Sequence, residues 1–573
     1  MSRREPWIPA AVALLAFFAF LPVLDNDLVD WDDILNLTEN YHFRGLSWRQ
    51  IRWAFNTFHV GVYQPVSWLL FEFQYVLFGL RPWGYHLVSL LWHAANMALL
   101  CAVSRRIITR AAPDWFEPAP LQRSLAVGVV VALFAVHPLR TEAVAWASCQ
   151  PYLPSIFFFQ CALLAYLRAD QGPRRRWLAA TFFLFLLALL AKAVAMTLPL
   201  VLLLLDVYPL RRFTRRQAWC VVAEKIPFLL LSALFARWAA SAKENIIASW
   251  EQAGPSVRVA QASYGTVFYL IKTVWPVRLA TYYSMPDRLE LTTPLFLLCA
   301  LAVVATTALV LWRARRWPQI AAAWLAYLIL LAPNSGLVRF GAQLCADRYG
   351  YLATMPLVVL AAAGLGKLVS GRAGRMGVEL GGLAGAALVA LMMVSWVQCT
   401  VWHDTVAVWE NALENGGPAH GEIHGWLGSA LRDAGRFEEA EREFSIGLKM
   451  SSDNPSIWNN YGVLLGSMRR NGEALFLFRK AIQLKPKMVE AHNNLGNAHL
   501  LLGQQAPALA EFAESERLDP SQGQVHIFRG RVYLNRGDPA SAVREFQRAL
   551  QLNPYLDEAR ERLQKLSPSP AQS

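Results

Sequence analysis

The sequence predicts an all-α protein made of two parts, a polytopic bundle of membrane helices followed by an α-solenoid of repeats. The chain has 573 residues, of which 55% are hydrophobic and 17% charged, and its mean hydropathy is positive. This composition is too apolar for a soluble protein. Apolar residues form long blocks up to about Cys399, whereas the chain from Trp402 onward is polar. We expect a membrane domain at residues 1–400, a linker helix at 401–418, a repeat domain at 419–566 and a flexible tail at 567–573.

About eleven apolar segments are candidates for membrane-spanning helices. They lie at residues 7–24, 85–103, 124–139, 151–167, 177–191, 196–209, 218–238, 293–312, 318–334, 349–366 and 380–398. Several are shorter than the roughly 20 residues that a spanning helix normally needs, so their boundaries are approximate. Residues 261–277 are also apolar. We interpret them as a surface or re-entrant helix, because a further span would move the basic linker at 313–316 to the outer side.

Basic residues indicate the orientation of this bundle. The net charge is +13, and Lys and Arg gather in short linkers such as 105–110, 174–176, 211–216 and 313–316. This is the pattern of cytoplasmic loops and not that of a nucleic-acid-binding surface. We therefore expect a multi-pass inner-membrane protein with a cytoplasmic amino terminus. The first loop and the repeat domain then lie in the periplasm or another extracytoplasmic space.

Three residue types recur in the C-terminal part with a step of 34 residues. The recurring positions are Gly428, Gly462, Gly496 and Gly530, then Ala440, Ala474, Ala508 and Ala542, then Phe444, Phe478, Phe512 and Phe546. Small residues at two fixed places and an aromatic residue after the second are typical of tetratricopeptide repeats. We expect repeats that start near residues 421, 455, 489 and 523 and stack into a superhelix with a concave groove.

Polar residues follow the same step. His424, His492 and His526 recur once per repeat, but stacking separates equivalent positions by about one helix pair, so we expect packing residues and no shared metal. Adjacent asparagines also occupy the first helix of two successive repeats. Their amides can bind the backbone of an extended peptide, or they form solvated polar faces. The candidate acceptor groove therefore consists of Asn459, Asn460, Asn493 and Asn494.

The first outer loop begins with five aspartates within residues 25–40. Crowded carboxylates raise one another's proton affinity, so such a cluster needs cations, hydrogen bonds or a catalytic purpose. Motifs for nucleotide binding, serine hydrolysis and zinc are missing from the sequence. Ionisable residues instead stand at the outer ends of the expected spans: Asp32, Asp33, His86, His93, His137, Arg140, Glu142, Lys192, Arg339, Asp347 and Arg348. Each is alternatively a snorkelling side chain or a member of a structural ion pair.

Transfer of a sugar from a lipid phosphate to a hydroxyl group fits this set. The acceptor hydroxyl needs a carboxylate to take its proton, and Asp32 or Asp33 can supply it. Adjacent side chains diverge, so we expect one aspartate to be the base and the other to orient it. The departing lipid phosphate needs cations, for which the candidates are Arg140, Lys192, Arg339 and Arg348. Asp30 and Asp32 could alternatively hold a divalent cation, which a monophosphate leaving group surrounded by arginines does not require.

Several stretches resemble the transmembrane and tetratricopeptide-repeat-containing O-mannosyltransferases, including their bacterial relatives, along almost the whole chain. The matching stretches begin at Trp31-Asp-Asp, Gln64-Pro-Val-Ser-Trp, Gly84-Tyr-His, His137-Pro-Leu-Arg-Thr-Glu, Lys192-Ala-Val-Ala-Met-Thr, Trp275-Pro, Tyr282-Tyr283 and Ala346-Asp-Arg-Tyr. The resemblance implies a GT-C fold, a polyprenyl-phosphate-linked donor, mannose as the sugar, catalysis by Asp32 and Asp33, and acceptor binding by the repeats. Cys149-Gln-Pro-Tyr152 departs from the charged stretch that many relatives carry at this place.

The leading hypothesis is thus a membrane glycosyltransferase of inverting mechanism that modifies Ser and Thr hydroxyls of exported proteins. Residues His86, His93, His137, Glu142, Tyr282, Tyr283 and Asp347 are expected to line its site. One alternative is a non-catalytic membrane scaffold whose repeats recruit partners in envelope assembly. Another is a transferase that acts on a glycan or a lipid.

Overall fold

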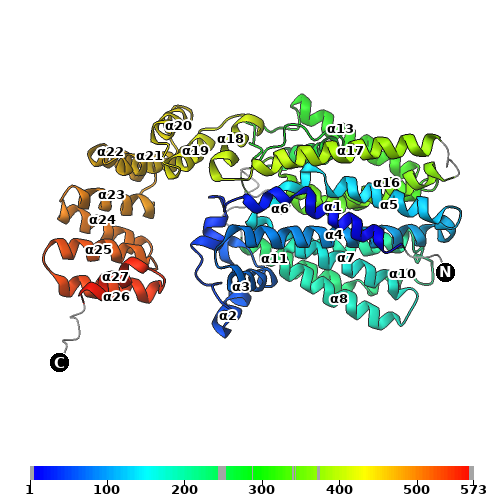
Figure 1. Cartoon of the computed structure of the whole chain (residues 1–573), viewed down its shortest axis with the longest axis horizontal. Helices are drawn as coiled ribbons and strands as arrows, with labels where there is room; N and C mark the ends of the chain where they lie inside the picture. Colours follow the sequence, from blue (N-terminus) through cyan, green and yellow to red (C-terminus); the bar gives the residue numbers. More distant parts are fainter. Residues whose placement is uncertain are drawn as a thin grey trace. The chain divides into compact units, whose positions relative to one another are not determined.

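A computed structural model describes residues 5–242, 253–286, 288–338, 341, 343–370 and 375–566. The chain divides into two compact units, Met1–Pro418 and Ala419–Ser573 (Figure 1). Within the described ranges the structure is helical and contains no strand, apart from one isolated antiparallel bridge between Ser284 and Gln343. The all-α prediction is therefore confirmed.

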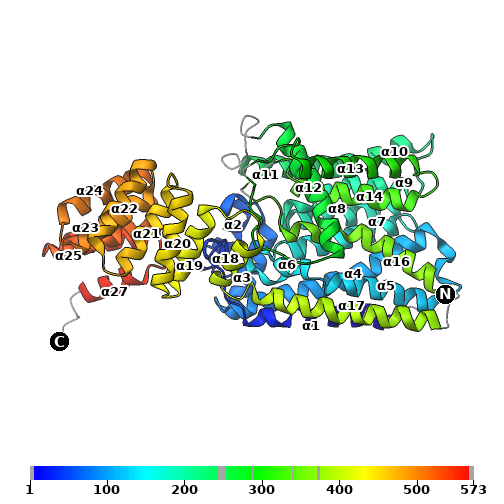
Figure 2. The same ribbon diagram turned by 90° about the horizontal axis from the view of Figure 1, so that it is seen from above.

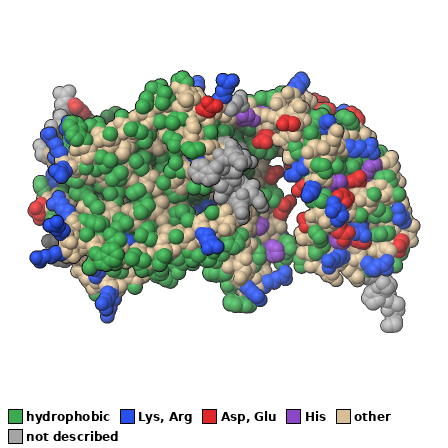
Figure 3. Space-filling model, turned by 180° about the vertical axis from the view of Figure 1, so that it is seen from behind, with side chains coloured by type: hydrophobic (Ala, Val, Ile, Leu, Met, Phe, Trp, Pro, Cys, Tyr) green, Lys and Arg blue, Asp and Glu red, His purple; other side chains and the backbone are tan. Residues whose placement is uncertain are grey.

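The first unit is a bundle of long helices that run side by side (Figures 1 and 2). Its main helices are α1 (Trp7–Ala19), α4 (Pro82–Ala111), α5 (Pro120–Ala135), α7 (Tyr152–Ala169), α8 (Arg174–Ala191), α9 (Leu198–Val207), α11 (Ile226–Ala242), α13 (Pro294–Trp312), α14 (Pro318–Leu331), α16 (Met355–Val369) and α17 (Arg375–Thr400). Each of the eleven expected spans overlaps one of these helices. On the face seen in Figure 3, apolar side chains cover most of the unit, and Lys and Arg gather at one end of it.

Five segments of the described chain are long and apolar enough to cross a membrane, and seven if two bent helix pairs each count as one span. This makes the chain a membrane protein. Three further apolar helices, among them α1, are shorter. The number of eleven spans therefore remains a prediction.

Shorter helices lie between the long helices of this bundle and after the last of them. They include η1 (Leu21–Asp25), η2 (Ile34–Thr38), α2 (Trp48–Asn56), α3 (Pro65–Phe78), η5 (Pro138–Arg140), α6 (Thr141–Ala145), η6 (Ala147–Cys149), η7 (Ala193–Thr197), η9 (Asp347–Tyr349), α15 (Gly350–Ala353) and α18 (Thr405–Asn415). Several of them, such as α2, α3, α6 and α18, lie toward the end opposite the amino terminus (Figure 2). Segment η2 is a single turn of π-helix, a geometry often found at functional sites. Helix α18, in the expected linker, packs on the first unit.

The apolar segment at 261–277 lies on α12 (Pro255–Val274). The Tyr327 hydroxyl donates a 2.6 Å hydrogen bond to the Thr266 carbonyl oxygen, and the Tyr269 hydroxyl donates to the Ala346 carbonyl oxygen over 2.9 Å. The helix ends at Val274 and Trp275, whose side chains are exposed. Helix α12 is thus anchored along its length by buried tyrosines.

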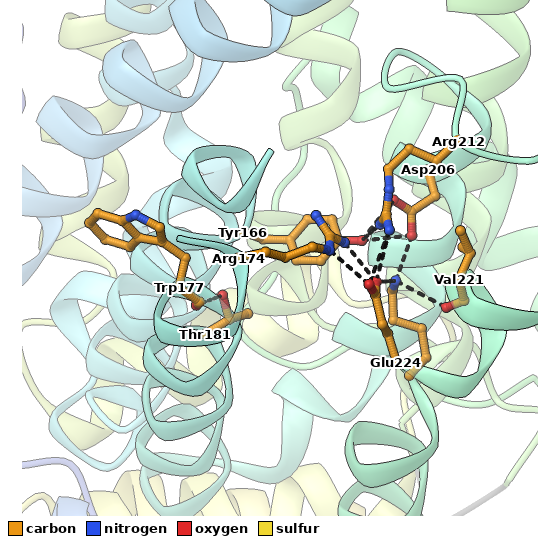
Figure 4. A network of polar contacts seen from close by, with 9 residues as sticks. Tyr166, Arg174, Trp177, Thr181, Asp206, Arg212, Val221 and Glu224 are labelled. Carbon is orange, nitrogen blue, oxygen red and sulfur yellow. Dashed lines mark hydrogen bonds and ion pairs between the residues drawn. The ribbon is translucent and has the colours of Figure 1, made fainter. Parts of the chain in front are cut away.

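Several arginines of the basic linkers take part in an ion network at the ends of α7, α8 and α9 (Figure 4). The buried Asp206 carboxylate accepts from the Tyr166 hydroxyl at 2.6 and 2.7 Å and pairs with Arg212 at 2.8 Å and Lys225 at 2.6 Å. Glu224, on the same network, binds Arg174 and Arg212. Charged residues therefore fasten the helix ends to one another.

The second unit consists of four helix pairs and a final helix. They are α19 (Gly421–Asp433) with α20 (Phe437–Met450), α21 (Pro455–Ser467) with α22 (Asn471–Leu484), α23 (Val489–Leu501) with α24 (Gln505–Leu518), α25 (Gly523–Asn535) with α26 (Pro539–Leu552), and α27 (Asp557–Leu566). Each pair contributes buried residues to a core shared with the next pair. The prediction of a repeat solenoid is confirmed.

Close packing inside each pair explains the recurring glycine. A methyl group added at Gly462, Gly496 or Gly530 would come within 2.6 Å of the buried phenylalanine of the same repeat. The first helix can approach this ring only without a side chain, which is the reason why Gly and Phe recur together.

Gly496→Ala is expected to destabilise its repeat by about 1–3 kcal/mol, because Phe512 must move to admit the methyl group. Hydrogen exchange of the full chain should become faster across α23 and α24. Gly472→Ala is the matched control, since a methyl group there meets nothing within 4 Å. Equal protection in the two variants would contradict this account of the glycine.

Candidate functional site

Asp33 is a buried anchor of the acidic stretch. One carboxylate oxygen accepts a 2.7 Å hydrogen bond from the Ser148 amide, and the other accepts from the Val29 amide at 3.1 Å. Burial raises the pKa of Asp33 to about 7; the hydrogen bonds lower it, and the charge of Asp32 raises it. Asp33 therefore ties the acidic loop to η6 and holds its proton far more tightly than a free aspartate.

Asp32 precedes this anchor and is half-buried. Its carbonyl oxygen accepts from the Asn36 amide at 2.8 Å, in the turn that leads into η2. On its other side, Trp31 stacks on Trp146 at 4.7 Å between ring centroids and lies 5.2 Å from Trp409 of α18. Asp32 thus stands on a backbone that is fixed from both sides.

Four of the predicted charged residues converge around the Cys149 thiol. The charges of Arg348, Glu142, Lys192 and Asp32 all act on this thiol. These residues come from four separate parts of the chain: the segment η9, the helix α6, the end of α8 and the acidic loop. The structure therefore brings the candidate base and two candidate phosphate-binding cations into one site.

Arg348 and Glu142 form an ion pair within this site. The Glu142 carboxylate accepts from the Arg348 amide at 2.6 Å and from its guanidinium group. Arg348 also lies over the rings of Trp146, at 5.3 Å, and Tyr349, at 4.8 Å. Glu142 consequently orients this guanidinium, whose other edge reaches Gln343 and the Tyr349 hydroxyl.

Lys192 interrupts the helical path between α8 and η7, where its backbone is extended. The ammonium group donates to the Gln64 side-chain oxygen at 3.3 Å and lies 5.0 Å from the centre of the Tyr152 ring. Gln64 precedes α3, so the start of that helix helps to position the cation. This agrees with the sequence expectation of a polar environment for Lys192.

Arg140 has a different environment from Arg348. Its side chain is completely buried and lies over the rings of Phe134, at 4.1 Å, and Tyr351, at 5.4 Å. The charge of Asp347 also acts on it. None of its three guanidinium nitrogens has a hydrogen-bond partner among the described residues. Arg140 is thus a buried cation inside the bundle, packed between aromatic rings, and it does not belong to the group around Cys149.

The three histidines predicted to line the site make hydrogen bonds or backbone contacts inside the fold. His93 bonds the Tyr351 hydroxyl at 2.6 Å and the Ala135 carbonyl oxygen at 3.1 Å. His137 accepts from the Leu139 amide and contacts the Thr273 carbonyl oxygen, both at 3.2 Å. His86 is fully buried near the backbone of residues 26 and 27, and neither of its ring nitrogens has a hydrogen-bond partner among the described residues. The contacts of His93 and His137 give these two residues a structural role, and the site-lining role of all three stays a prediction.

The remaining predicted residues divide between two places. The Tyr283 hydroxyl donates to the Asp347 carboxylate at 2.9 Å, which connects two loops near Arg140. Tyr282 lies at the other place, 6.0 Å from the Trp31 ring. Arg339 lies outside the described residues. Within the described chain, no group of three or more His, Cys, Asp or Glu side chains is placed to share a metal ion.

Sequence reasoning missed the residues that support this site. They are Ser148, Gln64 and Trp146, which contact candidate residues directly, and Trp402 and Trp409, which pack on Trp146 and Trp31. Trp146 stacks with both Trp31, at 4.7 Å, and Trp402, at 5.6 Å. An unusual density of tryptophan beside the charged motifs was the available signal.

The repeat asparagines form a chain of hydrogen bonds across three repeats. Asn494 donates to Asn459 at 3.0 Å, Asn459 donates to Asn460 at 3.1 Å, and Asn460 donates to Ser429 at 3.2 Å. Asn493 donates to Gln522 at 2.7 Å. Three of the four predicted amides are thus aligned by one another, and the fourth is held by Gln522.

The repeated histidines pair with glutamates of the second helix. His424, His492 and His526 each contact a carboxylate at 2.6–2.7 Å, in Glu443, Glu511 and Glu545. In the second repeat Trp458 replaces the histidine and Leu477 stands at the glutamate position. The two positions therefore change together, polar in three repeats and apolar in the second, and the histidines contact their own repeat.

Comparisons with known proteins agree with the repeat architecture. Two tetratricopeptide-repeat family models match the chain, one at residues 402–455 and 462–523 and the other at 523–556. A solved thermophilic TPR protein of Thermus thermophilus is 17% identical, with 31% of this chain and 94% of that chain covered and a TM-score of 0.27. The Hsp70-Hsp90 organizing protein of Triticum aestivum is 38% identical over 81 residues, 14% of either chain.

Relatives of a second kind also match. The protein O-mannosyl-transferase Tmtc2 of Drosophila melanogaster is 36% identical over 154 residues, and Tmtc3 of the same organism is 37% identical over 127 residues. These matches cover 26% and 20% of this chain but only 15% and 14% of the relatives, so the chain spans a small part of their length. The chain carries a tetratricopeptide-repeat domain and is similar, over about a quarter of its length, to Tmtc protein O-mannosyl-transferases.

Proposed function

We propose that this chain transfers a sugar, mannose by analogy with its relatives, from a polyprenyl-phosphate donor to Ser and Thr hydroxyls of exported proteins. The observation that carries the proposal is that Trp31, the neighbour of Asp32, stacks on Trp146, while Arg348 lies over the same ring at 5.3 Å. The charges of Asp32, Lys192 and Arg348 also act on one thiol, that of Cys149. A carboxylate and cations around one site are the groups that such a transfer requires. The names of the relatives supply the reaction class.

The reaction is a single displacement with balanced charges. The acceptor oxygen attacks the anomeric carbon of the sugar while Asp32 takes its proton. The bond between this carbon and the phosphate oxygen breaks, and the electron pair leaves with the lipid phosphate. Lys192 and Arg348 stabilise the anion that departs. Because the new bond forms opposite the leaving group, the sugar configuration is inverted.

Asp33 positions Asp32 in this mechanism. Its two backbone hydrogen bonds fix the turn that carries Asp32, and Glu142 orients Arg348 in the same manner. Arg140 and the structural histidines support these loops from inside the bundle. We place this site in an extracytoplasmic compartment, with the basic linkers in the cytoplasm.

The burial of Asp33 predicts a pH dependence of stability. The unfolded chain releases this proton near 3.8, whereas the folded protein holds it up to about 7. Between these values the folded state binds more protons, so the free energy of unfolding falls as the pH rises. Thermal unfolding in detergent should therefore depend less on pH between about 4 and 7 in Asp33→Asn than in the natural protein. Asp25→Asn, with an exposed side chain, should keep the natural slope; equal slopes in both variants refute the prediction.

The repeats are proposed to bind the acceptor. The aligned amides of Asn460 and Asn494 offer donors and acceptors to the backbone of an extended peptide. Recognition of backbone groups suits an enzyme that modifies many sequences. An Asn460→Ala/Asn494→Ala variant should therefore raise the KM for a long peptide acceptor and leave the kcat unchanged.

The direct test uses the purified full chain, a radiolabelled polyprenyl-phosphate mannose and a Ser/Thr-rich peptide. Formation of an alkali-labile mannosyl peptide is the expected result. Absence of product with this donor and with the corresponding glucose and N-acetylglucosamine donors would overturn the proposal. Mass spectrometry of exported proteins, with and without the chain, then identifies natural acceptors.

The similarity to an Hsp70-Hsp90 organizing protein favours a second candidate, a membrane scaffold whose repeats recruit partners. The scaffold makes no use of Asp32. If Asp32→Asn leaves exported proteins normally glycosylated but loss of the repeats disturbs an envelope complex, the scaffold is correct.

A further inference from the structure

A cavity of about 490 Å³ lies between α4, α7, α9, α14 and α16, away from the residues around Cys149. This volume is within the range of about 300–1,000 Å³ that is typical of ligand sites. Most of the lining is apolar, with residues such as Leu163, Val201 and Leu330. The cavity therefore suits a hydrocarbon chain.

Three polar residues of the lining stand at helix ends, whereas a fourth, Gln160, lies within α7 and donates to the Asn96 side chain at 2.9 Å. Tyr208 follows the end of α9, Gln319 begins α14, and Lys367 stands in the last turn of α16. These helix ends belong to the end of the bundle that carries the basic linkers. The cavity is thus mostly apolar and carries a cation at one end.

A second basic residue is held beside this end. Trp115 lines the cavity, and the guanidinium group of Arg123 lies 4.9 Å from the centre of its ring. The Arg123 side chain also donates to the Ser370 hydroxyl, three residues beyond the exposed Lys367. Tryptophan and arginine in this arrangement are typical of the level of lipid headgroups.

We propose that the cavity is a binding site for an anionic phospholipid of the surrounding membrane. One acyl chain occupies the apolar space, and the headgroup phosphate lies between Lys367 and Arg123. A zwitterionic lipid would bring its own cation to these side chains, so the site should prefer a net negative headgroup. The site is distinct from the proposed donor site, because α6, which carries Glu142, lies toward the end of the bundle opposite the amino terminus (Figure 2).

Native mass spectrometry of the purified full chain tests this proposal with two lipids of identical acyl chains, phosphatidylglycerol and phosphatidylcholine. Phosphatidylglycerol should be retained at least about fivefold better, and Lys367→Gln should remove most of this preference. Arg315→Gln removes an exposed cation of the same end that does not line the cavity, and it should change nothing. Equal retention of both lipids, or equal behaviour of the two variants, would overturn the proposal.

Filling the cavity provides an independent measurement. Ala322→Trp places an indole in the lining and should abolish retention of phosphatidylglycerol, whereas Ala305→Trp on the exposed face of α13 should not. If Ala322→Trp does not fold, Lys367→Gln decides alone. Displacement of phosphatidylglycerol by undecaprenyl phosphate, one molecule for one, would assign the cavity to the donor's lipid chain and refute the phospholipid site.

Discussion

Asp32→Asn should lower the rate of sugar transfer by about 100- to 10,000-fold, the usual contribution of a general base. The amide has nearly the shape of the carboxylate, so the turn and the tryptophan stack beside it should persist. What disappears is the group that takes the acceptor proton. The measurement is the kcat of the purified variant with a lipid-linked sugar and a peptide, together with its thermal unfolding midpoint.

The control for this variant lies in the same acidic stretch. Asp25 is exposed, so Asp25→Asn removes one of the five crowded charges without removing the base. It should retain nearly full activity. The transfer rate of Asp33→Asn should lie between those of Asp32→Asn and Asp25→Asn, because this substitution disturbs the position of Asp32 but leaves the group that takes the proton. Transfer by Asp32→Asn at the rate of Asp25→Asn would exclude Asp32 as the base.

Asp206→Asn should be the most destabilising single substitution in the ion network, by about 3–5 kcal/mol. It leaves Lys225, which is completely buried, without its 2.6 Å counter-ion, and Arg212 loses a partner as well. The cost arises from a buried cation that keeps only the more distant Glu224 carboxylate, at 3.5 Å, and not from lost volume. Thermal unfolding of the purified protein in detergent, and its yield from membranes, report this effect.

Asp170→Asn is the matched comparison, because Asp170 pairs with Arg110 at 2.9 Å but remains about one-third exposed. Exposed ion pairs contribute only about 0–1 kcal/mol. Combining Asp206→Asn with Lys225→Met should recover much of the stability, since the buried cation is then removed. Equal unfolding midpoints for the two single variants would show that the network is dispensable.

The sequence predicted those features that depend on local periodicity. A step of 34 residues determines the repeat helices, because each Gly must meet a Phe of its own repeat. Long apolar blocks likewise identify the bundle helices. The span number remained open, because helix ends depend on contacts with neighbouring helices and not on composition alone.

Pairing between distant residues could not be predicted in this way. Arg140 and Arg348 look alike in the sequence, as charged residues after apolar runs. In the structure Arg348 is paired with Glu142, 206 residues away, and Arg140 lies between aromatic rings. Likewise, nothing near Asp33 in the chain indicates that Ser148 holds it. Such roles arise from the packing of loops, which periodicity does not describe.

Helix α18 and the residues after it are fastened to the loops around the proposed base. Thr405 accepts from the Asp30 amide at 2.8 Å, Trp409 packs on Trp31, and the Gly416 carbonyl oxygen accepts from the Ser284 amide at 2.8 Å. Residues 417–420 alone then join this segment to the first repeat. A pull on the repeats would therefore reach this segment through only four residues, and α18 is the helix of the segment that packs on the tryptophan next to Asp32.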